Sequence, residues 1–107
     1  MEVIPLNPDE RRLYPRHQPV VALFIDATFE DGSRRRAEVL DWSLQGMRLL
    51  FRPTQDIHGG GAIAISGADG DQREPARVQW CHHKRHFTVA GIRACGQSFT
   101  LQLASGA

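Results

Sequence analysis

Short runs in which apolar residues recur at every second position constrain the fold of this chain more than any other feature. Between positions 46 and 51, Met47, Leu49 and Phe51 alternate with Arg48 and Leu50. A spacing of two places side chains on one face of an extended strand. Ahead of the C-terminus no stripe of about 10 to 12 residues follows the 3.6-residue spacing of an amphipathic helix. The sequence therefore predicts an all-β fold.

Other segments rich in alternating, β-branched or aromatic residues predict further strands. They span residues 20–29, 34–40, 62–66, 76–81 and 87–94. In the segment 76–81, the period of two predicts that Ala76, Val78 and Trp80 share one face. Residues 97–103 also alternate and predict a last strand, with a short helix as the weaker alternative.

Turn signals separate these segments at fairly even intervals. Asp31-Gly32 is a hairpin signal, and Pro53, the glycines at 59–61 and the segment 67–71 interrupt the chain further on. Short strands at such spacing favour a small six-stranded antiparallel β-barrel, in which closure removes exposed edges, over a sandwich. Four prolines precede position 20 and disfavour regular structure there. We expect a flexible N-terminal arm over residues 1–10 and a single barrel domain over 11–107.

Length and composition limit the classes of function. The chain has 107 residues, enough for one small domain, with 41% apolar and 23% charged residues. Thirteen basic and twelve acidic residues give a net charge of +1, too balanced for binding long nucleic acid by charge alone. Neither a signal peptide nor an apolar run of about 18 residues is evident. Two cysteines fit a reducing compartment, so we expect a cytoplasmic protein without a membrane partner.

Two short polar motifs carry the functional signal. Arg12 and Arg16 lie four residues apart, and Asp41, Ser43 and Gly46 follow at the end of a predicted strand. Guanidinium groups match the geometry of phosphate oxygens and of the O6/N7 edge of guanine. A carboxylate and a hydroxyl two residues apart on a strand share a face, and glycine permits close approach. The motifs indicate a site for an anion and a purine.

The motifs and the strand pattern together resemble the PilZ domain family. That family has an Arg-x-x-x-Arg loop before its first barrel strand and an Asp/Asn-x-Ser-x-x-Gly motif at a strand edge, which correspond to residues 12–16 and 41–46. The segments Arg77-Val78-Gln79-Trp80 and Ala90-Gly91-Ile92-Arg93 are similar to its later strands. The resemblance implies a split-barrel fold and binding of cyclic di-GMP, a bacterial second messenger.

The resemblance also implies roles for the site residues. Arg12 and Arg16 would contact phosphates and guanine O6/N7, and Asp41 would accept hydrogen bonds from guanine N1–H and N2–H₂. Ser43 would hydrogen-bond a phosphate or the same guanine, and Gly46 would keep the strand edge open. A large cation at Arg11, just before the motif, favours two stacked ligand molecules over one. The family often ends in a helix that covers the barrel, whereas we expect little or no C-terminal helix in this chain.

Each candidate residue has a simpler structural interpretation. Arg12 and Arg16 alone would suit a solvated basic arm, and Asp41 and Ser43 a strand-ending turn. Trp80 is a candidate for base stacking, although packing is the commoner role of such a residue. The cluster of Cys81, His82, His83 and His86 lacks the spacing of a zinc site, so we expect no metal.

Three functions compete at this point. The first is a non-enzymatic sensor or adaptor that binds cyclic di-GMP, needs no cofactor and acts on a downstream protein partner. The second is a small β-barrel that binds RNA or single-stranded DNA, which 7% aromatic residues disfavour. The third is a PilZ-like domain that acts only through protein contacts. We expect no catalytic residues and no DNA or RNA partner, and leave a homodimer open.

Overall fold

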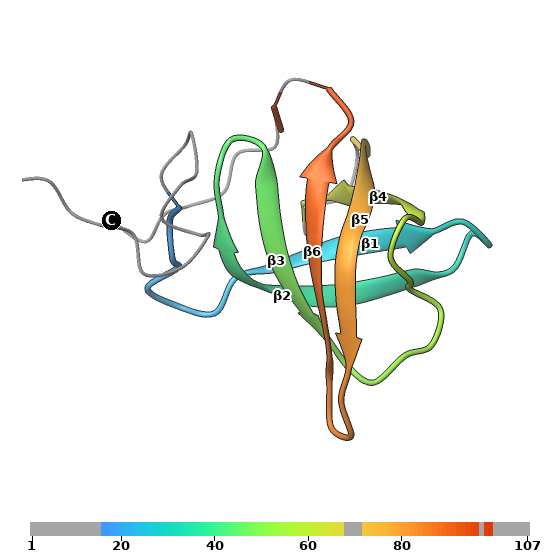
Figure 1. Ribbon diagram of the computed structural model, residues 1–107. Helices are drawn as coiled ribbons and strands as arrows, with labels where there is room; N and C mark the ends of the chain where they lie inside the picture. Colours follow the sequence, from blue (N-terminus) through green and yellow to red (C-terminus); the bar gives the residue numbers. More distant parts are fainter. Residues whose placement is uncertain (1–15, 68–71, 97, 100–107) are drawn as a thin grey trace, which may run out of the picture.

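The computed structural model describes residues 16–67, 72–96 and 98–99, which contain six strands and no helix (Figure 1). The strands close into one antiparallel barrel in the order β1-β2-β3-β6-β5-β4. Their bounds are β1 Phe24–Phe29, β2 Arg34–Trp42, β3 Gly46–Phe51, β4 Ala62–Ser66, β5 Glu74–His83 and β6 Thr88–Ala94. The predicted six-stranded antiparallel barrel is confirmed.

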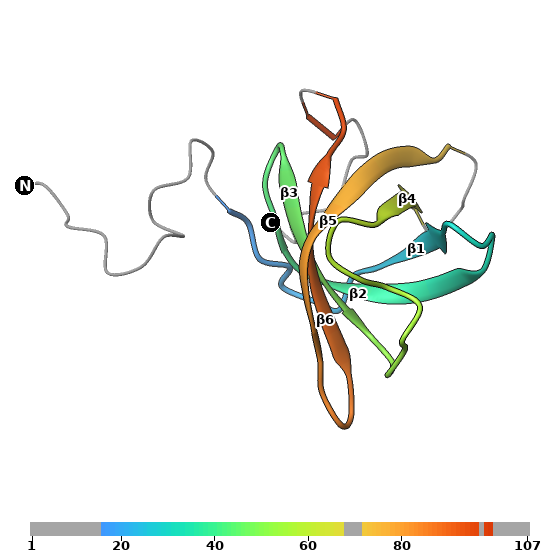
Figure 2. The ribbon, with the colours of Figure 1, turned by 45° about the vertical axis from the view of Figure 1, so that its right-hand side comes forward.

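The barrel encloses one apolar core, around which the strands wrap in Figure 2. Side chains at every second position of each strand point inward, as in β3, where Met47, Leu49 and Phe51 are buried. The most deeply buried residues also include Val39 of β2 and Ile65 of β4. Closure pairs β1 with β4 and β3 with β6, so no strand of the barrel is left with an unpaired edge.

The predicted first strand begins too early. Residues 20–23 lie outside β1, and Val20 and Val21 are exposed. The β1–β2 register, in which Phe24 faces Glu38, would place Val20 opposite Trp42 if it continued. His17 occupies that place instead, in an isolated bridge to Trp42. The intervening residues loop out of the sheet, because the chain has three more residues than the register needs.

The bounds of the other strands differ less from the prediction. β5 is longer than predicted at both ends, and Phe87 precedes β6 in the turn of a hairpin that projects from the barrel (Figure 1). Of the predicted strand at 97–103, the structure describes Ser98 and Phe99, neither of which is in a strand. The predicted arm at 1–10 lies outside the described residues.

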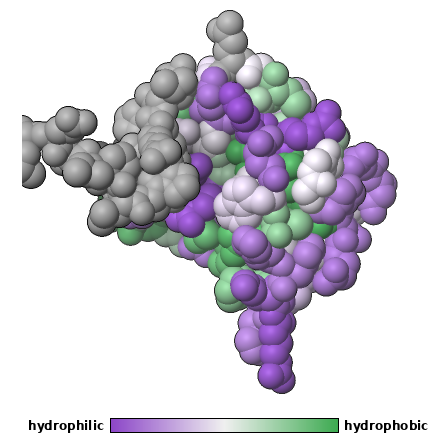
Figure 3. Space-filling view, in the orientation of Figure 1, coloured by the Kyte–Doolittle hydropathy of each residue, from purple (hydrophilic) through white to green (hydrophobic). Residues whose placement is uncertain are grey.

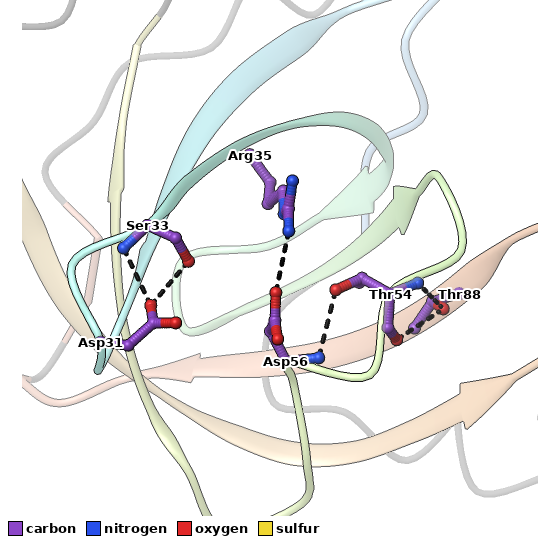
Figure 4. A network of polar contacts seen from close by, with 6 residues as sticks. All are labelled: Asp31, Ser33, Arg35, Thr54, Asp56 and Thr88. Atoms are coloured by element: carbon purple, nitrogen blue, oxygen red, sulfur yellow. Dashed lines mark hydrogen bonds and ion pairs between the residues drawn. The ribbon is translucent and has the colours of Figure 1, made fainter.

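Side-chain hydrogen bonds fix two connections of the barrel (Figure 4). In the β1–β2 turn, Ser33 donates its backbone N–H and its hydroxyl to Asp31, at 2.8 and 2.6 Å, and these bonds lower the pKa of that carboxyl. After β3, the backbone N–H of Thr54 donates to the hydroxyl of the buried Thr88 at 3.2 Å. The Thr54 hydroxyl in turn accepts from the N–H of Asp56 at 3.1 Å. The chain after β3 is therefore held against β6.

Candidate functional site

A β-bulge places Asp41 on the outside of the barrel. Val39 faces Leu49 of β3, but Asp41 faces Arg48, so Leu40 is an extra residue on β2. Without it, Asp41 would continue the inward alternation of Ala37 and Val39 and bring a carboxylate into the apolar core. The extra residue turns Asp41 to the outer face and Trp42 inward, where it packs against the core.

Two arginines cover the Asp41 carboxylate. Arg16, from the segment before β1, donates to Oδ1, while Arg48 donates to Oδ2 through Nε at 2.7 Å and Nη2 at 2.6 Å. Only 5% of the Asp41 side chain is exposed, compared with 21% for Arg16 and 38% for Arg48. Such charge-assisted bonds are among the stronger ones in proteins. Both carboxylate oxygens are thus already engaged.

The segment that carries Arg16 is attached to β2 by backbone hydrogen bonds. The N–H of His17 donates to the carbonyl of Trp42 at 2.7 Å, and the N–H of Trp42 donates back to His17 at 3.0 Å. The His17 ring lies against the Trp42 ring, with centroids 5.6 Å apart. In Figure 1 this segment passes beside the β2–β3 hairpin. The bridge explains how Arg16 comes within reach of a carboxylate 25 positions away.

Ser43 and Gly46 close the tight turn between β2 and β3. The N–H of Ser43 donates to the Gly46 carbonyl at 2.7 Å, and the N–H of Gly46 donates to the Ser43 hydroxyl at 3.1 Å. The carbonyls inside this turn also accept bonds, Leu44 from Phe99 at 2.7 Å and Gln45 from Ala94 at 2.9 Å. Ser43 therefore has the turn-forming role that its sequence context left open, and its hydroxyl is committed to the backbone.

Gly46 lies against the arginine of the site. A Cβ atom at this position would sit 3.5 Å from Nη2 of Arg16, 3.6 Å from the Ile92 carbonyl oxygen and 3.7 Å from the Ser43 hydroxyl. These are ordinary contact distances, so a methyl group would fit while Arg16 stays in place. A larger side chain would compete with Arg16 for the same space. Glycine keeps room beside the carboxylate.

Trp80 lies in the same cross-strand row as Asp41 but apart from it. The register aligns Asp41 of β2 with Arg48 of β3, Arg48 with Gly91 of β6, and Gly91 with Trp80 of β5. A Cβ on Gly91 would collide with the indole ring of Trp80, which shows that the ring lies across this glycine. Trp80 is therefore two strands away from Arg48, roughly 10 Å at the usual strand spacing.

The expected single face for Ala76, Val78 and Trp80 is wrong. Ala76 and Val78 are buried in the barrel, whereas Trp80 is 37% exposed on the outside. The cause is a second bulge, at Gln79, because Val78 faces Ile92 but Trp80 faces Gly91. As on β2, one extra residue exchanges the inner and outer faces of the strand.

Most of the predicted site residues that the structure describes lie together. Arg16, Asp41, Ser43 and Gly46 form one cluster, and Trp80 does not join it. The predicted residues Arg11 and Arg12 lie outside the described residues.

The sequence interpretation missed Arg48. A signal was present, because a turn closed by Ser43 and Gly46 sets the hairpin register and places position 48 opposite position 41.

The histidines near Cys81 do not form a metal site in the described part of the chain. The Cys81 thiol lies 3.5 Å from Nε2 of His83, and its other contact is the Ile57 carbonyl at 3.7 Å. Among the residues described, no three His, Cys, Asp or Glu side chains gather so that they could hold a metal ion. The same residues contain no helix of the length and apolarity needed to cross a bilayer.

Solved structures share this architecture. The PilZ domain of YcgR from Escherichia coli with c-di-GMP superposes with a TM-score of 0.64 at 20% identity, over 85% of this chain and 82% of that one. YcgR from Escherichia coli in complex with c-di-GMP gives a TM-score of 0.60 at 24% identity, over 84% of this chain and 40% of that one. No family model and no curated protein sequence matches.

The described part of the chain forms a closed six-stranded barrel with a polar cluster at the β2–β3 hairpin. Its fold is that of a PilZ domain, as the motif resemblance implied. It spans 40% of the length of the longer YcgR chain.

Proposed function

We propose that this chain binds cyclic di-GMP at the cluster formed by Arg16, Asp41 and Arg48, and acts as a non-enzymatic sensor or adaptor. The observation that carries the proposal is the pairing of Arg16 with Asp41, because it joins the two motifs that the sequence keeps apart. The PilZ fold supports it, since both YcgR structures that share the fold contain c-di-GMP.

Asp41 supplies selectivity for guanine in this proposal. Guanine presents N1–H and N2–H₂ side by side, which matches the two oxygens of a carboxylate, and adenine has no such pair of donors on that edge. Oδ1 accepts from Arg16 and has a second lone pair, whereas Oδ2 already accepts two hydrogen bonds from Arg48, so a guanine N–H at Oδ2 requires Arg48 to release one of its two donors. Arg48 donates to Oδ2 and orients the carboxylate from the β3 side.

Arg16 changes partners when the ligand binds. It shields Oδ1 of Asp41, and its Nε is a buried atom without a hydrogen-bond partner. A buried N–H without an acceptor is unfavourable by about 1 to 3 kcal/mol. A phosphate or a guanine O6/N7 edge offers acceptors for the whole guanidinium, including Nε. The ligand thereby satisfies Arg16 and uncovers Asp41 in one step.

The remaining motif residues complete the proposed site. Arg12 contacts the second phosphate or guanine, Ser43 holds the turn beneath the nucleotide, and Gly46 keeps the approach open. Trp80 is a stacking surface for a base that extends along the row through Arg48 and Gly91. Arg11 favours two stacked ligands, so substitution of Arg11 by leucine should reduce the stoichiometry measured by calorimetry from two toward one.

Binding also orders the arm and stabilises its junction with β2, which is already hydrogen-bonded at His17 and Trp42, and a partner protein reads this change. The N–H groups of His17 and Trp42 report it directly, because their hydrogen bonds join the arm to β2. Their hydrogen exchange should slow when cyclic di-GMP is added. Equal exchange rates with and without ligand would reject the ordering step.

Titration calorimetry with cyclic di-GMP, GTP and a short RNA tests the function itself. We expect binding of the cyclic dinucleotide only, with affinity lost in Arg16→Ala and Asp41→Ala. Preferential RNA binding would favour a single-strand-binding barrel. Binding of none of the three would favour a domain that acts through protein contacts alone.

A further inference from the structure

A second arginine cluster lies in a groove far along β2 from Asp41. The groove has a volume of about 780 Å³ and runs over the start of β2, the end of β3 and the β5–β6 hairpin. Its basic side chains are Arg35, Arg36 and Arg52, with His86 beside them. The size falls within the usual range for ligand pockets.

Apolar side chains line the groove between its charged residues. The register aligns Phe24 of β1 with Glu38 of β2 and Glu38 with Leu50 of β3 on the outer face. Phe24 is 42% exposed and Phe87, on the hairpin side, is 39% exposed, so both leave apolar surface open to solvent within the groove. An occupant therefore gains affinity by burying an apolar side chain here.

Two of the groove arginines form no ion pair among the described residues. Arg35 binds Asp56 at 2.9 Å, and Asp56 is held by Thr54 in the wall of the groove (Figure 4). Within the described residues, the side chains of Arg36 and Arg52 form no hydrogen bond and no ion pair, although Asp26 of β1 lies across from Arg36 in the register. The β2–β3 register, in which Glu38 faces Leu50, would set these two arginines opposite each other if it continued past the end of β3. Like charges in that position repel, and a carboxylate between them removes the repulsion.

We propose that this groove docks an acidic segment of a partner protein, with carboxylates at Arg36 and Arg52 and an aromatic or large aliphatic side chain between Phe24 and Phe87. Glu38 lies in the groove and disfavours the continuous phosphates of a nucleic acid. It suits a peptide instead, because a carboxylate accepts backbone N–H groups. The adjoining β5–β6 hairpin is mostly hydrophilic on the face seen in Figure 3 and carries Lys84 and Arg85, which extend the positive field toward an acidic partner. This proposal is independent of nucleotide binding.

The test is a titration of the isotope-labelled 107-residue chain, followed by amide chemical shifts. The probe peptide has the sequence Asp-Glu-Phe-Asp-Glu-Leu. One matched peptide replaces the acidic residues by Asn and Gln, and another replaces the apolar residues by Ser. Oligouridylate is titrated in parallel as the nucleic-acid comparison. We expect shifts confined to the groove residues and at least about fivefold weaker binding of either altered peptide.

Variants separate groove binding from general attraction to positive charge. The double variant Arg36→Gln/Arg52→Gln should weaken the probe peptide about tenfold. Arg73→Gln, which removes an exposed arginine outside the groove, should change the affinity less than about twofold. Should the double variant lose its dispersed spectrum, Arg52→Gln alone replaces it, since Arg52 is exposed and makes no bond among the described residues.

Three results would overturn the proposal. One is the absence of groove shifts at millimolar peptide, and another is an equal loss of affinity in Arg73→Gln. The third is tighter binding of oligouridylate than of the peptide in the groove, which would assign the surface to single-stranded nucleic acid.

Discussion

The two ends of β2 and β3 use the same residue type in opposite ways. At the hairpin end, Arg16 and Arg48 converge on the buried carboxylate of Asp41. At the other end, Arg36 and Arg52 line one groove on the surface, and neither forms an ion pair among the described residues. The difference shows that an arginine pair alone does not define a site. The burial and charge of what lies between the guanidiniums decide which ligand the pair accepts.

The hairpin end is organised before any ligand arrives. A buried carboxylate with two guanidiniums is stable only as a set, because removing one member leaves charge without compensation. At the groove end no buried carboxylate depends on the arginines, so Arg36 and Arg52 can bind a carboxylate of another molecule. A base-selective nucleotide site suits the first arrangement and a peptide-docking surface suits the second.

The largest expected effect on stability comes from Asp41→Ala. It leaves Arg16 and Arg48 facing each other without a carboxylate, and we expect the free energy of unfolding to fall by about 1 to 3 kcal/mol. The estimate is reduced from the fully buried case because Arg48 is 38% exposed. Urea denaturation measures it. A loss below about 0.5 kcal/mol would show that the two ends do not differ as described.

Gly91→Ala tests the packing of the row beside the site. The new methyl group would collide with Trp80, so the indole must move, and we expect a loss of about 1 to 2 kcal/mol. The indole N–H resonance of Trp80 should shift by NMR. Gly96→Ala is the matched control, because a Cβ there meets no atom within 4 Å. Equal effects of the two substitutions would refute the placement of Trp80 over Gly91.

Arg48→Gln should lower stability by about 1 kcal/mol and weaken cyclic di-GMP binding several-fold. It removes the donors to Oδ2 and lets the Asp41 carboxylate rotate. Paired denaturation and calorimetry distinguish this positioning role from a purely structural one. A fall in stability with unchanged affinity would leave Arg48 outside the ligand site.

The smallest expected effect has the opposite sign. Arg52→Gln removes one of the cations that line the groove, so stability should stay constant or rise by up to about 0.5 kcal/mol. Urea denaturation at low and high salt checks the cause, because the gain should vanish as salt screens the repulsion. A clear loss of stability would mean that Arg52 has a structural partner.

The sequence predicted the positions of the strands and motifs better than it predicted which side chains of a strand point into the barrel. Local alternation locates β2 and β5, but a single extra residue at Leu40 or Gln79 reverses which side chains point inward. Bulges depend on the pairing of both strands, and a single strand carries no local signal for them. The exposed position of Trp80 follows from the bulge at Gln79 and could not be inferred from period two.

The contact of the segment at Arg16 and His17 with β2 was the other feature beyond prediction. The attraction between Arg16 and Asp41 follows from their charges, and their proximity required the pairing of His17 with Trp42. That bridge joins an isolated residue to the end of β2, and strand propensity gives no indication of it. By contrast, Arg48 was predictable, because the Ser43–Gly46 turn fixes the hairpin register.

The most direct test of the account is calorimetric titration of cyclic di-GMP into the wild type, Asp41→Asn and Arg73→Gln. Asparagine keeps the shape of Asp41 but replaces one acceptor oxygen by a donor, which opposes the guanine N–H groups and both arginines. We predict a loss of about 10- to 100-fold in affinity for Asp41→Asn and wild-type affinity for Arg73→Gln. Wild-type affinity in Asp41→Asn would contradict the assignment of the nucleotide site to this carboxylate.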